Sequence, residues 1–244
     1  MKGEKRFISW LINNIRHLRP ILNFVIFSAI ITLSGLARDH EPNYDVVVIG
    51  GTPAGVAAAI AAARADKTVI IIEQAPVLGG VLSSGVLRLD DKYVESNSGV
   101  MDEFRRRVKT YHRTVMADDP LVKEHIEQNP PMRWNIAEGR AWEPHTSARI
   151  YAEMVGEHKT ISMRFNEVAV DVIMKGQRVT GVITCERDNQ GKLGAQHTYL
   201  GKIIIDGTYE SDLAEFADIP YRIGREARSK EEPHAGHIYT TYFR

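Results

Sequence analysis

The feature that most constrains the fold of this chain is the segment 44–80, which combines two apolar runs with two glycine-rich turns. Residues 44–49 are β-branched and apolar without alternation, which is typical of a parallel strand buried on both faces. A glycine turn follows, then an alanine-rich helix over 56–65 and a second apolar strand over 67–72. This order of strand, turn, helix and strand predicts an α/β fold with a parallel sheet.

The turn Gly50-Gly51-Thr52-Pro53-Ala54-Gly55 predicts contacts to the pyrophosphate of a dinucleotide. Gly50 permits a tight turn and Gly55 permits close packing of the helix, while the N–H groups at the helix start face the phosphates. Glu73 ends the second strand about 20 residues later, where a dinucleotide fold places the carboxylate that accepts hydrogen bonds from the ribose. We therefore expect the six turn residues and Glu73 to bind a cofactor.

Thr52 stands where the G-x-G-x-x-G pattern has its middle glycine. Its Cβ narrows the approach of the backbone to the pyrophosphate, and its hydroxyl could donate to a phosphate oxygen instead. The alternative to nucleotide binding is a βαβ unit of another doubly wound domain, in which the glycines serve packing alone.

A second glycine pair, Gly79-Gly80, follows Glu73 and Gln74 within a few residues of sequence. It allows another backbone loop to approach an extended dinucleotide near its pyrophosphate and flavin half, which a simple NAD site does not require. The pair favours FAD over NAD, and it adds Gln74, Gly79 and Gly80 to the expected cofactor contacts.

Three later segments show a resemblance to a known family, namely Glu143-Pro144-His145, residues 202–213 and residues 223–229. With these motifs, residues 44–244 resemble the FAD-dependent oxidoreductases of the glutathione-reductase-like superfamily. The resemblance implies a Rossmann-like FAD-binding domain with a parallel sheet, a β-meander and a helical excursion. It also implies hydride or electron transfer between FAD and a small organic substrate, with His145 near the cofactor; a cap or surface role is an equal alternative for His145.

Residues 161–165 are expected to form the third parallel strand, and alternating segments then predict an antiparallel meander. The meander strands and their turns are expected at residues 167–174, 175–177, 179–185, 188–191 and 197–200. The resemblance implies that Val168, in the first of these strands, meets the adenine through its backbone.

A strand over 202–205 is expected to return to the parallel sheet and to deliver Asp206 and Gly207 at its carboxyl end. Ligands bind at this edge in open α/β sheets, so we expect both residues to contact the cofactor. The alternative is an Asx turn that ends the strand.

Residues 86–142 are interpreted as a partial insertion on the substrate side, made of helices and loops with a helix over 100–112. Trp134 and Trp142 are candidates for a pocket wall or for the core. A further amphipathic helix is expected over 146–157, just after Pro144.

The charge of the chain is balanced, with 31 basic and 31 acidic residues, so no broad attraction to nucleic acid is expected. The local run 105–107 is interpreted as a solvated helix face. The single cysteine, Cys185, excludes an internal disulfide and a paired-thiol redox centre. The disulfide reductases of the superfamily are therefore excluded.

The first 43 residues predict an export or anchoring segment, since basic residues within 1–19 precede the mostly apolar run 21–36. A signal peptide cleaved after Ala37 is the preferred interpretation, and an uncleaved membrane anchor over 20–37 is the alternative. Both place the body outside the cytoplasm, secreted or periplasmic, with a possible membrane tether.

No second glycine-rich return to a flavin follows Asp206, so we expect 44–244 to be the first part of a longer protein or a truncated product. The sequence identifies no catalytic residue; the candidates after the cofactor strand are Glu210, Asp212, Arg225 and Glu226. His234 and His237 lack further ligands for a metal site. The rival functions are an NAD(P)-binding dehydrogenase and a non-catalytic or defective nucleotide-binding fragment.

Overall fold

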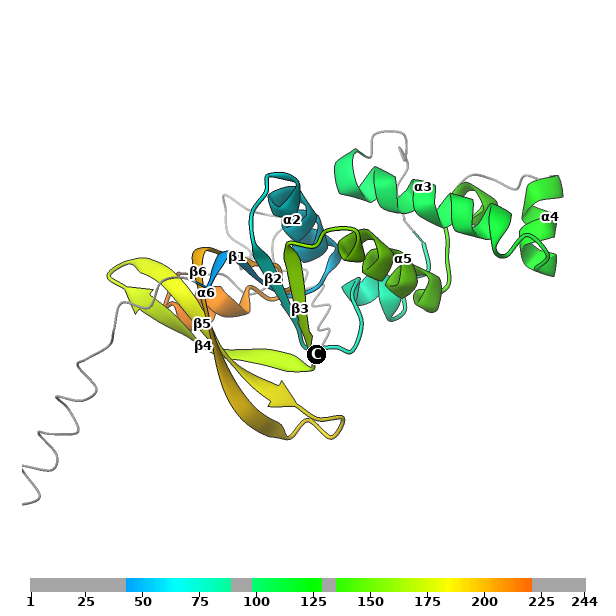
Figure 1. Ribbon diagram of the computed structural model, residues 1–244. Coiled ribbons are helices and arrows are strands. Elements are labelled where there is room, and N and C mark those ends of the chain that lie inside the picture. Colours follow the sequence, from blue (N-terminus) through cyan, green and yellow to red (C-terminus); the bar gives the residue numbers. More distant parts are fainter. Residues whose placement is uncertain (1–42, 89–97, 129–134, 221–244) are drawn as a thin grey trace, which may run out of the picture. The chain divides into compact units, whose positions relative to one another are not determined.

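The computed structural model describes residues 43–88, 98–128 and 135–220, all within one compact unit of the chain (Figure 1). In chain order, the described elements are β1 (Tyr44–Ile49), α2 (Pro53–Arg64), β2 (Val69–Glu73), η1 (Gly80–Ser83), α3 (Gly99–Thr114), α4 (Pro120–Gln128), η4 (Ile136–Glu138), α5 (Pro144–Gly156), β3 (Ile161–Phe165), β4 (Glu167–Lys175), β5 (Arg178–Arg187), β6 (Leu193–Asp206) and α6 (Asp212–Phe216).

The strands form a sheet in the order β3-β2-β1-β6-β5-β4. The pairs β3–β2, β2–β1 and β1–β6 are parallel, whereas β6–β5 and β5–β4 are antiparallel. The α/β class, the parallel sheet, the meander and the helical segment between β2 and β3 are therefore confirmed.

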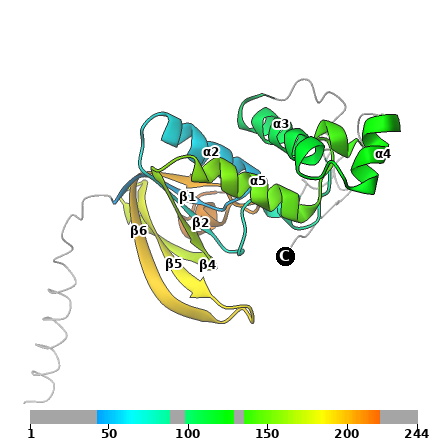
Figure 2. The same ribbon diagram turned by 45° about the vertical axis from the view of Figure 1, so that its right-hand side comes forward.

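Strand β6 joins the two halves of this sheet, and here the structure differs from the expectation of two strands over 197–200 and 202–205. One continuous strand, Leu193–Asp206, pairs with β5 up to Leu200 and with β1 from Gly201 onward. Figure 2 shows the long β6 ribbon running from the meander to the side of β1. A Cβ at Gly201 would lie 2.8 Å from Cγ2 of Val47, so a glycine allows the close approach where the strand changes partner.

Helices α2, α3 and α5 contribute to the apolar core on one face of the parallel strands. The residues of α2 that face the sheet are small or β-branched, and they pack on Val46 and Val48 of β1 and on Val69 and Ile71 of β2. Phe104 of α3 stacks on Tyr151 of α5 with ring centroids 4.4 Å apart. Trp142 meets Phe104 edge to face and is buried, so it belongs to the core.

The meander and α6 cover the opposite face of the parallel strands. Val47 and Ile49 of β1 point to this side with Ile70 and Ile72 of β2. They pack with apolar residues of the meander and with Leu213 of α6. Burial on both faces explains the uninterrupted apolar runs in the first two strands.

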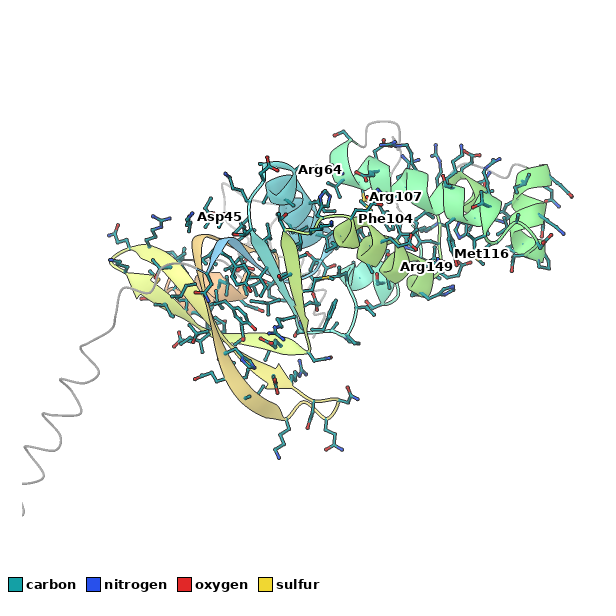
Figure 3. All side chains as sticks on the ribbon, viewed as in Figure 1. Asp45, Arg64, Phe104, Arg107, Met116 and Arg149 are labelled. Atoms are coloured by element: carbon teal, nitrogen blue, oxygen red, sulfur yellow. The ribbon has the colours of Figure 1, made fainter. Side chains whose placement is uncertain are left out.

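Ion pairs connect the helices around the arginine run 105–107. Arg107 of α3 reaches Glu157 after α5 at 2.5 Å, and Arg64 of α2 reaches Glu103 of α3 at 2.5 Å. Figure 3 labels Arg64 and Arg107. Arg106 is exposed and pairs with Asp102 on its own helix. Only part of this run is a solvated helix face, because Arg107 bridges two elements.

Several expectations fall outside the described residues. These concern residues 1–42 of the signal or anchor segment, with the apolar stretch 20–37. They also concern Trp134, the motif 223–229 with Arg225 and Glu226, and the pair His234 and His237. Among the described residues, no helix combines the length and the apolar character needed to span a membrane.

Candidate cofactor-binding site

Three glycines bring the end of β1, the start of α2 and the end of β6 into direct backbone contact. A Cβ at Gly55 would lie 1.9 Å from the carbonyl oxygen of Gly50, and one at Gly207 would lie 2.9 Å from Cα of Gly55. Gly50 has a φ of +93°, a conformation that favours glycine. The turn can therefore form only with these residues lacking side chains.

Thr52 is the N-cap of α2 and also ties the turn to β6. Its Oγ1 accepts a hydrogen bond from the N–H of Gly55 at 3.2 Å and donates to the carbonyl of Gly207 at 2.6 Å. The hydroxyl hydrogen is thus directed at Gly207, whereas the sequence suggested a phosphate oxygen as its acceptor. The helix begins at Pro53, so Pro53 and Ala54 belong to its first turn.

Glu73 lies at the carboxyl end of β2 with only 6% of its surface exposed. Its Oε2 accepts from the N–H of Gly51 at 2.5 Å and its Oε1 accepts from the N–H of Ala75 at 2.7 Å. Burial raises the pKa of Glu73, and these backbone donors oppose that shift. A carboxylate offers about four lone-pair sites, so capacity remains for ribose hydroxyls.

The second glycine pair packs against the first glycine turn. The N–H of Gly79 donates to the carbonyl of Gly51 at 2.7 Å, and both glycines of the pair have positive φ values, +103° and +50°. The short helix η1 begins at Gly80, and its Val81 N–H donates to the phenolic oxygen of Tyr209 at 2.9 Å. Two loops distant in sequence therefore meet at the same edge of the sheet.

These loops enclose a pocket of about 400 Å³ at the carboxyl ends of the parallel strands. Its lining residues come from the ends of β1 and β2 with the loops that follow them, η1, the start of β4, the end of β5, and the segment from the end of β6 into α6. They are Ile49, Gly50, Thr52, Ile72, Glu73, Gln74, Ala75, Val77, Gly80, Val81, Ser84, Glu167, Val168, Ala169, Arg187, Thr208, Tyr209, Glu210 and Asp212.

The structure brings part of the predicted set together in this pocket. The predicted residues that line it are Gly50, Thr52, Glu73, Gln74, Gly80 and Val168. The other predicted residues do not line the pocket but are adjacent in sequence to residues that do or lie close to them. They are Gly51, Pro53, Ala54, Gly55, Gly79, Asp206 and Gly207. Gly55 and Gly207 allow close backbone contact, whereas a Cβ at Gly51 or Gly79 would meet packed side chains.

Asp206 has the geometry of an Asx turn, the alternative to a cofactor contact. Its Oδ1 accepts from the backbone N–H and the hydroxyl of Thr208, at 3.0 and 2.6 Å. Its Oδ2 accepts from the N–H of Leu213 in α6 at 2.9 Å. Asp206 therefore orders the segment after β6, which itself lines the pocket.

Sequence reasoning missed several lining residues, including Thr208, Tyr209 and Arg187. Tyr209 lies inside the motif 202–213 that carried the resemblance, so its position next to Asp206 and Gly207 was the available signal. Arg187 had no such signal, because tertiary contacts at the end of β5 place it. Its N–H donates to the carbonyl of Asn166 at 2.7 Å, and its guanidinium lies near the side chain of Gln74.

The candidates for other roles are distributed differently. His145 is exposed at the start of α5 and does not line the pocket, which agrees with a surface role. Glu210 and Asp212 do line it, and burial, together with nearby carboxylates, raises the pKa of Asp212. Within the described ranges, no group of three or more histidine, cysteine or acidic side chains is placed to hold a metal ion.

The fold and this site define a dinucleotide-binding domain with a parallel sheet, in which the helix start, a buried acid and a second glycine loop converge. The chain matches the family described as FAD dependent oxidoreductase over residues 45–244. It belongs to that family, which confirms the family and the cofactor expected from the sequence.

Curated relatives carry names of reductases. Digeranylgeranylglycerophospholipid reductase 2 of Methanothermobacter thermautotrophicus is 28% identical over 176 residues, 72% of this chain and 42% of the relative. Urocanate reductase of Eggerthella lenta is 28% identical over 163 residues, 61% of this chain and 23% of the relative. The chain thus spans less than half the length of each of these two relatives.

Among solved structures, the chain is similar to L-proline dehydrogenase from P. horikoshii, with 18% identity, 77% of this chain and 59% of the other covered, and a TM-score of 0.47. It is also similar to glycerol-3-phosphate dehydrogenase from Bacillus halodurans complexed with FAD. There the identity is 16%, the coverage 75% of this chain and 37% of the other, and the TM-score 0.44.

The residues of the pocket fit the adenosine diphosphate half of FAD. The positive end of the α2 dipole suits the pyrophosphate, and the first turn of α2 carries no acidic side chain. Gly50 and Gly80 let the pocket wall close tightly, because a Cβ would lie 2.8 Å from the Gly207 backbone or 2.3 Å from the Tyr209 hydroxyl. Glu73 supplies acceptors for ribose hydroxyls, and Val168 lines the pocket, where its backbone can meet the adenine.

Proposed function

We propose that this chain forms the FAD-binding part of an oxidoreductase in which hydride or electrons pass between FAD and a small organic molecule. The observation that carries the proposal is the meeting of the glycine turn, buried Glu73 and the second glycine pair around one pocket. The flavin supplies the redox chemistry when bound, and the protein binds it, orients it and excludes water.

The protein's own contribution in the described part is binding and orientation of the dinucleotide. The α2 N-terminus and the glycine backbone hold the phosphates, while Glu73 fixes the ribose. The names of the curated relatives support reduction of an organic acceptor as the direction of the reaction.

The test is to purify the chain without added cofactor, denature it, and identify the released nucleotide by chromatography and mass spectrometry. FAD is the expected product, in a sample whose visible flavin absorbance bleaches with dithionite and returns with an electron acceptor. Release of NAD(P) would favour the rival dehydrogenase. A folded sample that neither contains nor takes up any nucleotide would contradict the proposal and favour a non-catalytic fragment.

The proposal extends to location, where the basic and apolar pattern of residues 1–37 supports export or tethering. A tagged chain is expected in the periplasmic, extracellular or membrane fraction, shortened after Ala37 if the signal peptide is cleaved. Recovery of the unshortened chain in the cytoplasmic fraction alone would contradict this part.

A further inference from the structure

Tyr209 connects two loops that line the cofactor pocket from opposite parts of the sequence. It follows β6, whereas its phenolic oxygen accepts a hydrogen bond from the N–H of Val81 at 2.9 Å. Both residues line the pocket together with Gly80. The Val81 N–H lies in the first turn of η1, where backbone donors need an acceptor outside the helix.

The ring of Tyr209 also explains why residue 80 has no side chain. A Cβ at Gly80 would lie 2.3 Å from the phenolic oxygen and 3.1 Å from Cε2 and Cζ of the ring. Gly80 has a φ of +50°, so a substitution there is strained as well as crowded. The tyrosine and the glycine therefore form one contact that fixes the second glycine loop.

The phenolic hydrogen of Tyr209 remains available to a ligand. The hydrogen bond with Val81 uses the oxygen as an acceptor, and a phenol can donate at the same time. Burial raises the pKa of Tyr209, although the Val81 N–H opposes the shift, so the hydroxyl stays protonated at neutral pH. Tyr209 is 53% exposed as a residue, so a ligand in the pocket can reach it.

We propose that Tyr209 is a positioning residue for FAD, which holds the Gly79-Gly80 loop against the segment after β6 and donates its O–H to an oxygen of the bound dinucleotide. This inference rests on the proposed function, because it needs FAD in the pocket. It adds a contact from the segment after β6, which the glycine motifs do not include.

The test compares FAD binding by the full chain and by Tyr209→Phe, using flavin fluorescence. We expect the variant to bind FAD about 5–10-fold more weakly, the effect of one or two lost hydrogen bonds. Tyr44→Phe is the matched control, because Tyr44 is half-buried at the start of β1 and does not line the pocket. Its affinity for FAD should equal that of the wild type.

Amide hydrogen exchange supplies a readout that does not require flavin. In Tyr209→Phe without FAD, the Val81 amide should exchange faster, while amides in the centre of β1 keep their protection. The double variant Gly80→Ala/Tyr209→Phe should lose less FAD affinity than the product of the fold-losses of the two single variants. The reason is that Phe removes the phenolic oxygen that the new Cβ at residue 80 would meet.

The outcomes separate the two claims. If the wild-type chain binds no FAD, the proposed function fails and this inference fails with it. If the wild type binds FAD and Tyr209→Phe binds it within about two-fold of the wild-type affinity, the inference is wrong while the proposed function stands. Loss of the native circular dichroism spectrum in Tyr209→Phe would also overturn it, since Tyr209 would then be structural.

Discussion

The hydroxyl of Thr52 donates a hydrogen bond of 2.6 Å to the carbonyl of Gly207, across 155 positions of the sequence. The same oxygen caps α2 by accepting from the N–H of Gly55. One side chain therefore fixes the start of the helix and joins the first glycine turn to the end of β6. This use of the hydroxyl gives Thr52 a structural reason to replace the glycine of the usual pattern.

Thr52→Val should destabilise the protein by about 2–3 kcal/mol, because it removes the helix cap and leaves the buried carbonyl of Gly207 without its donor. Thr52→Ser keeps the hydroxyl and should cost less than about 1 kcal/mol. Urea denaturation followed by circular dichroism measures both. Equal losses in the two variants would show that the methyl group, not the hydrogen bond, is the important part of Thr52.

Gly55→Ala should prevent normal closure of the turn, since the new Cβ would lie 1.9 Å from a backbone oxygen. We expect a loss of at least about 3 kcal/mol. Gly156→Ala at the end of α5 is the control, because a Cβ there meets nothing within 4 Å. The control should change the stability by no more than about 1 kcal/mol. If both variants unfold at the same urea concentration, the proposed close contact of the three glycines is wrong.

Glu73→Gln replaces a carboxylate that accepts from two backbone N–H groups by an amide that can accept at only one of its atoms. The buried N–H that faces the new NH₂ group loses its partner, so a cost of about 1–3 kcal/mol is expected, with weaker FAD binding. Glu124→Gln on the exposed side of α4 should stay within about 0.5 kcal/mol of the wild type. Unchanged FAD affinity in Glu73→Gln would contradict the ribose role.

The pair His112 and Glu143 gives the protein an acid-sensitive contact away from the pocket. His112 is fully buried, with Nε2 at 3.1 Å from the Glu143 carboxylate and Nδ1 at 2.8 Å from the carbonyl of Ile136. The hydrogen bond with His112 lowers the pKa of Glu143 from its ordinary value of 4.5 to about 2, although burial opposes the shift. The stabilisation is therefore present above pH 4.5 and is lost as the pH falls toward 2.

Glu143→Gln should lower the free energy of unfolding by about 1–2 kcal/mol at neutral pH. This is less than the energy equivalent of the full pKa shift, because the Glu143 side chain is one-third exposed to solvent. As the pH falls below about 4.5, the free energy of unfolding should decrease less steeply in the variant than in the wild type. Urea midpoints measured from neutral pH down to about pH 3 test this. Parallel pH curves for the two proteins would contradict the assigned pKa shift.

The first parallel strands, the glycine turn and the place of Glu73 at the end of a strand could be predicted from sequence because each has a local cause. Uninterrupted apolar runs indicate strands buried on both faces, and Gly50 and Gly55 indicate close backbone contacts. That β6 is one continuous strand could not be predicted, because a glycine such as Gly201 within an apolar run can equally indicate a break between two strands. Its pairing with both β5 and β1 is a tertiary effect.

The pocket could be predicted only in part for the same reason. Gln74 and Gly80, which lie next to a motif, were expected, whereas the place of Arg187 depends on the contacts of β5 with Asn166 and β6. The role of the Thr52 hydroxyl depends on Gly207, which the sheet brings beside it. Contacts between distant segments carry no signature within either segment alone.

Competition binding with the full chain tests whether this pocket recognises the adenosine diphosphate half of FAD. We expect saturable quenching of FAD fluorescence, displacement of FAD by ADP, and no measurable binding of riboflavin, which lacks phosphate and adenosine. If a folded chain does not bind FAD, or binds riboflavin as tightly as FAD, the pocket does not recognise the adenosine diphosphate half.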